Sequence, residues 1–127
     1  MEQKTIMIVD DNQDFLEELD ELLQESGYRT EVCASGKCAL EKVNDVHPDL
    51  ILLDMKMPEV SGFQVADKIH RGSGSGEIPI VAMTGYYTEK EHRLLMNVCG
   101  VRECLTKPFH PLDVIAVIER ELKKDEG

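Results

Sequence analysis

Short apolar runs alternate along the chain with longer segments whose apolar residues repeat at helical spacing. The run at residues 50–53 is apolar at every position, which is typical of a central strand covered on both faces of a parallel sheet. Runs of strand-like composition also occupy residues 4–9, 28–34, 78–83 and 101–106. The sequence therefore predicts five strands.

A segment with helical periodicity follows each of these runs. After residue 12, leucine and phenylalanine side chains fall on one face and acidic side chains on the other. Further helices are expected from Ser35, Ser61 and Thr88, because these hydroxyls can cap a first turn. Five strand–helix alternations predict an α/β fold with a doubly wound parallel sheet and right-handed crossovers.

The last helix is expected to begin near Pro111, a residue that suits a first helical turn. Val114 and Val117 fall off the inward stripe that we assign, so they either form an exposed patch used in pairing or output, or pack in the core. The residues assigned to the inward stripe are Leu112, Ile115, Ile118 and Leu122.

Length and charge limit the classes of function. The 127 residues fit one domain, 1–127, with a polar tail at 123–127. The net charge of −11 argues against direct nucleic-acid binding, which needs clustered Lys and Arg. No apolar segment approaches the roughly 20 residues of a membrane span. Because the N-terminus also differs from a secretory signal, we expect a cytoplasmic protein.

The cysteine and histidine positions give no metal signature. The four cysteines form no C-x-x-C pair, and the four histidines lack ligand spacing. We therefore expect reduced, idle thiols at the positions Cys33, Cys38, Cys99 and Cys104.

Polar residues lie at, or directly after, the carboxyl end of several predicted strands. They are Asp10, Asp11, Asp54, Thr84 and Lys107. In open α/β sheets ligands bind at this edge, so the fold should gather these side chains. Three neighbouring carboxylates repel one another and favour a hard divalent cation with oxygen ligands. Mg²⁺ is the expected ion.

This arrangement suits phosphoryl transfer. With a cation nearby, a carboxylate oxygen of Asp54 can attack a phosphoryl group and form an aspartyl phosphate. Lys107 would supply positive charge and Thr84 a hydrogen bond to the phosphoryl oxygens, and Gly85 leaves its backbone N–H accessible. Charge stabilisation and positioning are most of what phosphoryl transfer requires.

Four motifs carry a resemblance that covers essentially the whole chain: IMIVDDN, LILLDMKMPEVSG, AMTG and LTKPF. In this order and spacing the sequence resembles the receiver domain of bacterial two-component response regulators. The resemblance implies a flavodoxin-like sheet of order 2-1-3-4-5 with five helices. It also implies that a histidine kinase or phosphotransfer protein phosphorylates Asp54.

The resemblance further implies a role for each matching residue. Asp11, Asp54 and the backbone carbonyl of Lys56 would hold Mg²⁺ directly, and Asp10 would act mainly through water. Thr84, Gly85 and Lys107 would contact the phosphoryl oxygens, and the Lys107–Pro108 peptide is expected to be cis.

One departure concerns the conformational switch. Receivers signal when the residue matching Thr84 turns toward the phosphate and an aromatic residue of the last strand rotates inward, but this aromatic position is Cys104. We therefore expect the switch to rely on Thr84 and the loop before the fourth helix. Lys56 and Tyr86 occupy the two positions that tune phosphoryl loss in the family. Because both are bulky, we expect a fairly long-lived phosphoryl state.

The leading hypothesis is a signalling module that catalyses only its own Mg²⁺-dependent phosphorylation and dephosphorylation. Its output would be binding of a downstream protein through the face made by the fourth helix, last strand and last helix. The sequence leaves open whether the domain forms a homodimer. One alternative is a metal-dependent phosphohydrolase with an aspartyl nucleophile. Such enzymes commonly place a second acid two residues later, where this chain has Lys56. The other alternative is a scaffold that binds its partner without phosphorylation.

Overall fold

Five parallel strands form the centre of the structure, a computed structural model that describes residues 3–72 and 74–126. The strand order is β2-β1-β3-β4-β5, which confirms the predicted flavodoxin-like sheet. The strands are β1 Thr5–Val9, β2 Arg29–Cys33, β3 Leu50–Asp54, β4 Ile80–Thr84 and β5 Val101–Thr106. The helices are α1 Gln13–Glu25, α2 Gly36–Val46, α3 Gly62–Arg71, α4 Glu89–Asn97 and α5 Pro111–Glu126.

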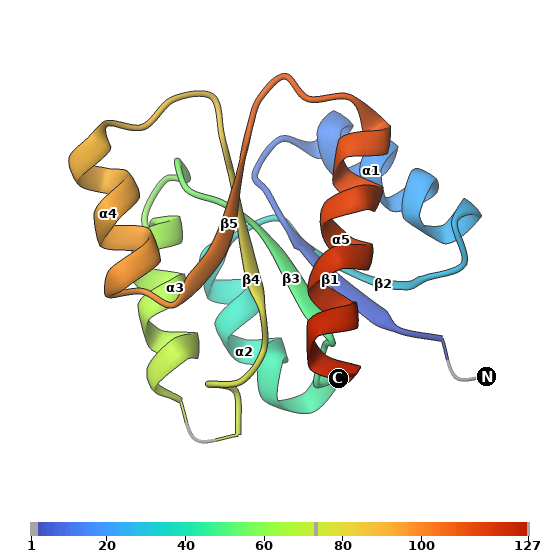
Figure 1. The fold of residues 1–127 in the computed structure, drawn as a ribbon, viewed down its shortest axis with the longest axis horizontal. Helices are drawn as coiled ribbons and strands as arrows, with labels where there is room; N and C mark the ends of the chain where they lie inside the picture. Colours follow the sequence, from blue (N-terminus) through green and yellow to red (C-terminus); the bar gives the residue numbers. More distant parts are fainter. Residues whose placement is uncertain (1–2, 73, 127) are drawn as a thin grey trace.

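Helices cover both faces of the sheet (Figure 1). Side chains of α2, α3 and α4 pack with one set of alternate strand residues, such as Met7 and Ile51, to form one core cluster. Side chains of α1 and α5 pack with the other set, such as Ile8 and Leu52, to form the second. All five residues of β3 are buried, as the unbroken apolar run predicts for a strand covered on both faces.

The strand boundaries differ from the predicted ones by a few residues. The run at 78–83 predicts a strand that starts at Ile78, but β4 starts at Ile80 and includes Thr84. Pro79 has no backbone N–H to donate to a sheet ladder, although its carbonyl accepts from the Ile51 N–H at 3.0 Å. The shift matters for function because it makes Thr84 the last residue of a buried strand.

The inward face of α5 differs from the predicted one. Leu112, assigned to the inward stripe, is 69% exposed, whereas Val114 and Val117 are buried. The buried stripe includes the carboxylate of Glu121, which is fully covered. A charged residue in a buried stripe shifts the apparent hydrophobic face, and this explains the error. The prediction that Val114 and Val117 form an exposed patch is therefore wrong. The alternative prediction, that both valines pack in the core, is correct.

The polar tail is not separate from the fold. Residues 123–126 continue α5, which ends at Glu126, and Gly127 lies outside the described residues. Lys123 and Lys124 lie in the last turn, where positive charge interacts favourably with the helix dipole.

No helix in the described ranges combines the length and apolar character needed to cross a membrane.

Candidate functional site

The carboxyl ends of four strands bring the predicted site residues to one edge of the sheet. Asp10 and Asp11 follow β1, Asp54 ends β3, Thr84 ends β4 and Lys107 follows β5. The Lys107 N–H donates to the Thr84 carbonyl at 2.7 Å, which extends the pairing of β4 and β5 beyond the last strand residue. The Lys107–Pro108 peptide is cis, as expected.

Three carboxylates form an acidic cluster at this edge. Ligand oxygens of Asp10, Asp11 and Asp54 all lie within 4.8 Å of one another. Asp10 and Asp54 are buried, whereas Asp11 is exposed. A cation can therefore reach the cluster from the side of Asp11, and the oxygen-only donor set suits a hard divalent ion such as Mg²⁺.

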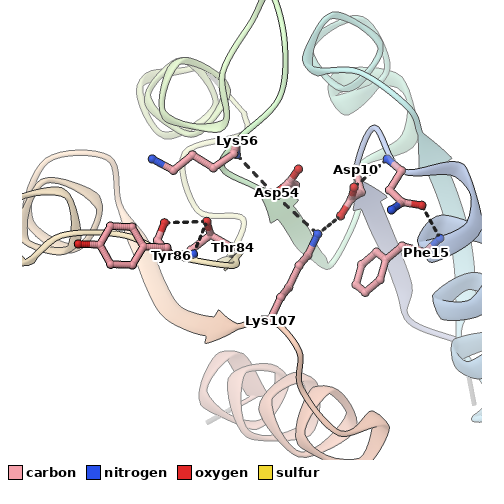
Figure 2. A network of polar contacts seen from close by, with 8 residues as sticks. Asp10, Phe15, Asp54, Lys56, Thr84, Tyr86 and Lys107 are labelled. Carbon is pink, nitrogen blue, oxygen red and sulfur yellow. Dashed lines mark hydrogen bonds and ion pairs between the residues drawn. The ribbon is translucent and has the colours of Figure 1, made fainter.

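The Lys107 ammonium lies between two of these carboxylates (Figure 2). Its Nζ atom is 2.6 Å from Asp10 Oδ2 and 3.8 Å from Asp54 Oδ1. The same nitrogen lies 4.2 Å from the centre of the Phe15 ring, an arrangement typical of a cation–π contact. Asp10 is thus the closer partner of Lys107 in this structure.

The electrostatic environment makes ionised Asp54 costly. Burial raises the pKa of the Asp54 carboxyl, and the negative charge of Asp10 raises it further. The Lys107 charge and a hydrogen bond from the Lys56 N–H oppose this increase without cancelling it. Additional positive charge beside Asp54 would therefore favour its ionised form.

Backbone groups fix the orientation of the buried acids. The Asn12 N–H donates to Asp10 Oδ1 at 2.9 Å, and the Lys56 N–H lies 3.4 Å from Asp54 Oδ1. The start of α3 packs directly on the end of β3 at Gly62. A Cβ atom there would lie 2.3 Å from the Asp54 carbonyl oxygen, so only glycine allows this approach.

The Thr84 hydroxyl is directed away from Asp54. It donates to the Tyr86 carbonyl at 3.1 Å and lies 3.4 Å from the Tyr86 N–H (Figure 2). A phosphoryl contact would therefore require the hydroxyl to leave this turn. At Gly85 an added Cβ would meet nothing within 4 Å, so the structure itself shows no steric reason for glycine there.

Lys56 and Tyr86 do not cover Asp54 in this structure. Lys56 Nζ is 2.8 Å from Glu91 Oε2, and this ion pair lowers the pKa of Glu91. The Tyr86 side chain is 71% exposed, and Figure 2 shows both side chains pointing away from Asp54. Screening of the phosphoryl group, as the sequence suggested, would require both side chains to turn inward.

Two aromatic residues near the site have roles that the sequence did not indicate. Phe15 contacts the Lys107 ammonium and also packs edge-on against Phe109, with ring centres 5.8 Å apart. Its helical spacing had marked it only as a core residue.

The second aromatic residue is Tyr87, in the loop before α4. Its ring stacks on His92 with ring centres 5.5 Å apart. Burial raises the pKa of the Tyr87 phenol, and a hydrogen bond with Thr106 lowers it. Cys104 also affects the Tyr87 pKa, so the phenol lies near the cysteine that occupies the expected aromatic position.

Comparison with known proteins decides the family. The family model described as the response regulator receiver domain matches residues 6–119. The chain belongs to the response regulator receiver domain family. This receiver domain is 32% identical over 124 residues to the DNA-binding response regulator MtrA of Mycolicibacterium smegmatis, covering 98% of the chain and 53% of the relative. The chain thus spans about half the length of its MtrA relatives.

Similar chains of comparable length are also known. The polar-differentiation response regulator DivK of Brucella ovis is 36% identical over 97 residues, or 76% of this chain and 79% of DivK. The chemotaxis protein CheY4 of Vibrio cholerae has a TM-score of 0.89 at 26% identity, covering 94% and 98% of the two chains. A CheY-like receiver domain protein from Methanospirillum hungatei has a TM-score of 0.93 at 27% identity, covering 98% of each.

Family membership establishes the general function. The chain is a receiver domain of two-component signal transduction, and the phosphohydrolase alternative is not favoured. Receiver domains interact with histidine kinases and downstream effectors, and they generally bind Mg²⁺ at an acidic pocket. The cluster of Asp10, Asp11 and Asp54 is compatible with such a pocket.

Proposed function

We propose that Asp54 is the phosphoacceptor and that a histidine kinase or phosphotransfer protein supplies the phosphoryl group. The observation that carries this proposal is the charge balance at the strand ends. Three carboxylates and one ammonium group share a small volume, which leaves two negative charges uncompensated within the group. A dication would balance those charges and let an anionic phosphoryl group approach.

The residues that would hold Mg²⁺ are Asp11, Asp54 and the backbone carbonyl of Lys56, with Asp10 acting mainly through water. The donor set fits, because the cluster offers only oxygen ligands. Bound Mg²⁺ would act as a Lewis acid that offsets negative charge on the carboxylates and the phosphoryl oxygens. Exposed Asp11 gives the ion a route from solvent.

In the transfer step, a carboxylate oxygen of Asp54 forms a bond to phosphorus as the phosphorus–nitrogen bond of the donor histidine breaks. The electron pair of that bond returns to the imidazole. Lys107 already lies 3.8 Å from Asp54 and would move from Asp10 toward a phosphoryl oxygen. Thr84 would exchange the Tyr86 carbonyl for another phosphoryl oxygen. Gly85 would offer its backbone N–H.

The domain would catalyse only the gain and loss of its own phosphoryl group. The output would be altered binding of a downstream protein through the α4–β5–α5 face. Helix α4 and its C-cap leave three apolar side chains exposed, which supports a protein-binding role. They are Leu94, Met96 and Val98.

Intact-protein mass spectrometry tests the proposal. The chain is incubated with acetyl phosphate, with and without Mg²⁺. We expect one added phosphoryl group that depends on Mg²⁺ and is absent from Asp54→Asn. The matched control is Asp45→Asn, because Asp45 is an exposed acid of α2 and should leave labelling unchanged. Rapid donor consumption without an added mass would indicate a hydrolase, and no reaction would indicate a scaffold. Either result would reject the proposal.

A further inference from the structure

Two cysteines lie in contact at the junction of β2 and α2. Cys33 is the last residue of β2, and Cys38 lies in the first turn of α2. Their Sγ atoms are 2.7 Å apart, compared with about 2.05 Å in a disulfide. The two sulfur atoms therefore need to move little to become bonded.

The turn between the two cysteines is well defined. Ser35 caps α2, and its Oγ accepts a hydrogen bond from the Cys38 N–H at 3.1 Å. Gly36 packs so closely on α3 and the loop before it that a Cβ there would lie 2.7 Å from a methyl group of Val65 and 2.9 Å from the Val60 carbonyl oxygen. These contacts hold Cys38 over the end of β2, so its closeness to Cys33 follows from the fold.

The two thiols differ in access and electrostatic environment. Cys33 is 1% exposed, whereas Cys38 is half-buried and reachable from solvent. Cys38 lies in the first turn of α2, at the positive end of the helix dipole. Lys42 follows one turn later, and its pKa is raised first by Glu31 and then by Cys38. The Lys42 ammonium, paired with Glu31 at 3.1 Å, thus lies near both sulfur atoms.

We propose that Cys33 and Cys38 form a reversible disulfide when the domain meets a peroxide, and that Cys38 reacts first. The Cys38 thiolate attacks one peroxide oxygen, the O–O bond breaks, and Cys38 becomes a sulfenic acid as hydroxide leaves. The Cys33 sulfur then displaces the sulfenic hydroxyl, which leaves as water with the Cys33 proton. The hydroxide takes up the proton that Cys38 lost in forming its thiolate, so in sum two thiols are oxidised and one molecule of hydrogen peroxide is reduced to two molecules of water.

This disulfide would modify the two cysteines chemically and would add little to the stability of the fold. It would close a very short loop, and loop-closure stabilisation is small for short loops. The Cys33 carbonyl accepts the Asp10 N–H at 3.1 Å, so the modified residue is joined by one hydrogen bond to the acidic cluster. The proposal does not rest on phosphorylation of Asp54.

Peptide mapping tests the pairing directly. The reduced chain is treated with hydrogen peroxide under native conditions, and remaining thiols are alkylated in denaturant. Trypsin should cut after Arg29, Lys37 and Lys42, which separates TEVCASGK from CALEK. We expect alkylated cysteines to fall from four to two and these peptides to become cross-linked, with reversal by dithiothreitol. Four alkylated thiols, or a cross-link to Cys99 or Cys104, would overturn the proposal.

Single substitutions test the order of reaction. Cys33→Ser should leave a sulfenic acid on Cys38 that dimedone traps, whereas Cys38→Ser should give no adduct on buried Cys33. Cys99→Ser is the matched control and should retain the cross-link. An adduct on Cys33 in Cys38→Ser would overturn the assignment of Cys38 as the first thiol to react. Circular dichroism of each variant checks that it is folded.

Discussion

Two groups of charged side chains lie in different parts of this receiver domain, and they are balanced differently. The acidic cluster of Asp10, Asp11 and Asp54 has one ammonium group, that of Lys107, close to two of its acids. The second group, on β5 and α5, has two carboxylates and three cationic side chains. It consists of Glu103, Glu121, Arg102, Arg120 and Lys124.

The difference separates a candidate metal site from a structural network. In the β5–α5 group, Arg120 pairs with Glu103, and Lys124 Nζ lies 2.7 Å from Glu121 Oε2. Each carboxylate of that group therefore has a cationic partner without a ligand. The acidic cluster does not, although Asp10 and Asp54 are buried. Buried negative charge without sufficient partners is costly, and this cost is what a bound dication would relieve.

The largest expected effect is stabilisation by Mg²⁺. At a free concentration 100 times the dissociation constant, Mg²⁺ should add about 2.7 kcal/mol to the free energy of unfolding. Asp54→Asn should lose most of this increment at the same concentration, because one ligand charge is gone. Urea denaturation with and without Mg²⁺ measures both. Glu121→Gln is the control and should keep the increment, since Glu121 lies in the balanced group. Equal losses in the two variants would contradict the comparison.

The next largest effect concerns Lys107. Without Mg²⁺, Lys107→Met should lower the free energy of unfolding by about 2 kcal/mol, because Asp10 loses its close partner while buried. Saturating Mg²⁺ should recover part of this loss, which urea denaturation would show. The matched control is Lys42→Met, which breaks an exposed pair with Glu31 and should change stability by less than about 0.5 kcal/mol. Similar losses in both variants would mean that Lys107 does not compensate buried charge.

The β5–α5 group should show opposite pH dependences at its two acids. Burial, followed by the hydrogen bond with Glu103, raises the pKa of Glu121, and Arg120 lowers the pKa of Glu103. Glu121 therefore contributes to the free energy of unfolding below pH 4.5, its ordinary pKa. This contribution is lost as the pH rises through the raised pKa of the folded chain. The Glu103 contribution is present above 4.5 and lost as pH falls through the lowered value.

Two conservative variants separate these contributions. From pH 4.5 to 7, Glu121→Gln should gain stability relative to the unmodified chain. As pH falls below 4.5, Glu103→Gln should become less destabilising relative to the unmodified chain. Denaturant midpoints measured across this pH range give the sign of each slope. The same sign for both variants would show that the two acids are not in the different environments described.

The smallest expected effect is on phosphoryl loss. Lys56→Asn combined with Tyr86→Ala should speed hydrolysis by less than about tenfold, below about 1.4 kcal/mol, because both side chains must turn inward to screen the phosphoryl group. The decay of the phosphorylated mass over time measures this rate. The control is Glu91→Ala, which frees Lys56 from its ion pair and should slow hydrolysis if the freed side chain screens. An unchanged rate in the double variant would reject screening.

Much of the fold could be predicted, because the pattern of apolar residues in each segment agrees with the place of that segment in the folded sheet. The apolar run that ends at Asp54 is a central strand, and its neighbours also end in polar residues, so topology alone brings Asp10 and Lys107 to Asp54. The buried face of α5 could not be predicted, because Glu121 interrupts its apolar stripe. Spacing also gave no sign of the Cys33–Cys38 contact, which depends on how α2 folds back over the end of β2.

Side-chain orientations were the other limit. The family resemblance indicated which positions carry Thr84 and Lys56, but a hydrogen bond to the Tyr86 carbonyl and an ion pair with Glu91 decide where these two side chains point. The aromatic residue near Cys104 is Tyr87, which lies in the loop before α4 and not in β5. Such a contact between distant segments cannot be predicted from the periodicity of the sequence.

The central claim is that the acidic cluster makes Asp54 the Mg²⁺-dependent phosphoacceptor. Borohydride reduction tests it directly, because it converts an aspartyl phosphate to homoserine at the modified position. After reaction with acetyl phosphate, trypsin should release residues 43–56 separately from residues 5–29, which carry Asp10 and Asp11. The account predicts homoserine at position 54 only when Mg²⁺ is present. Homoserine in the 5–29 peptide, or labelling at position 54 that is independent of Mg²⁺, would contradict it.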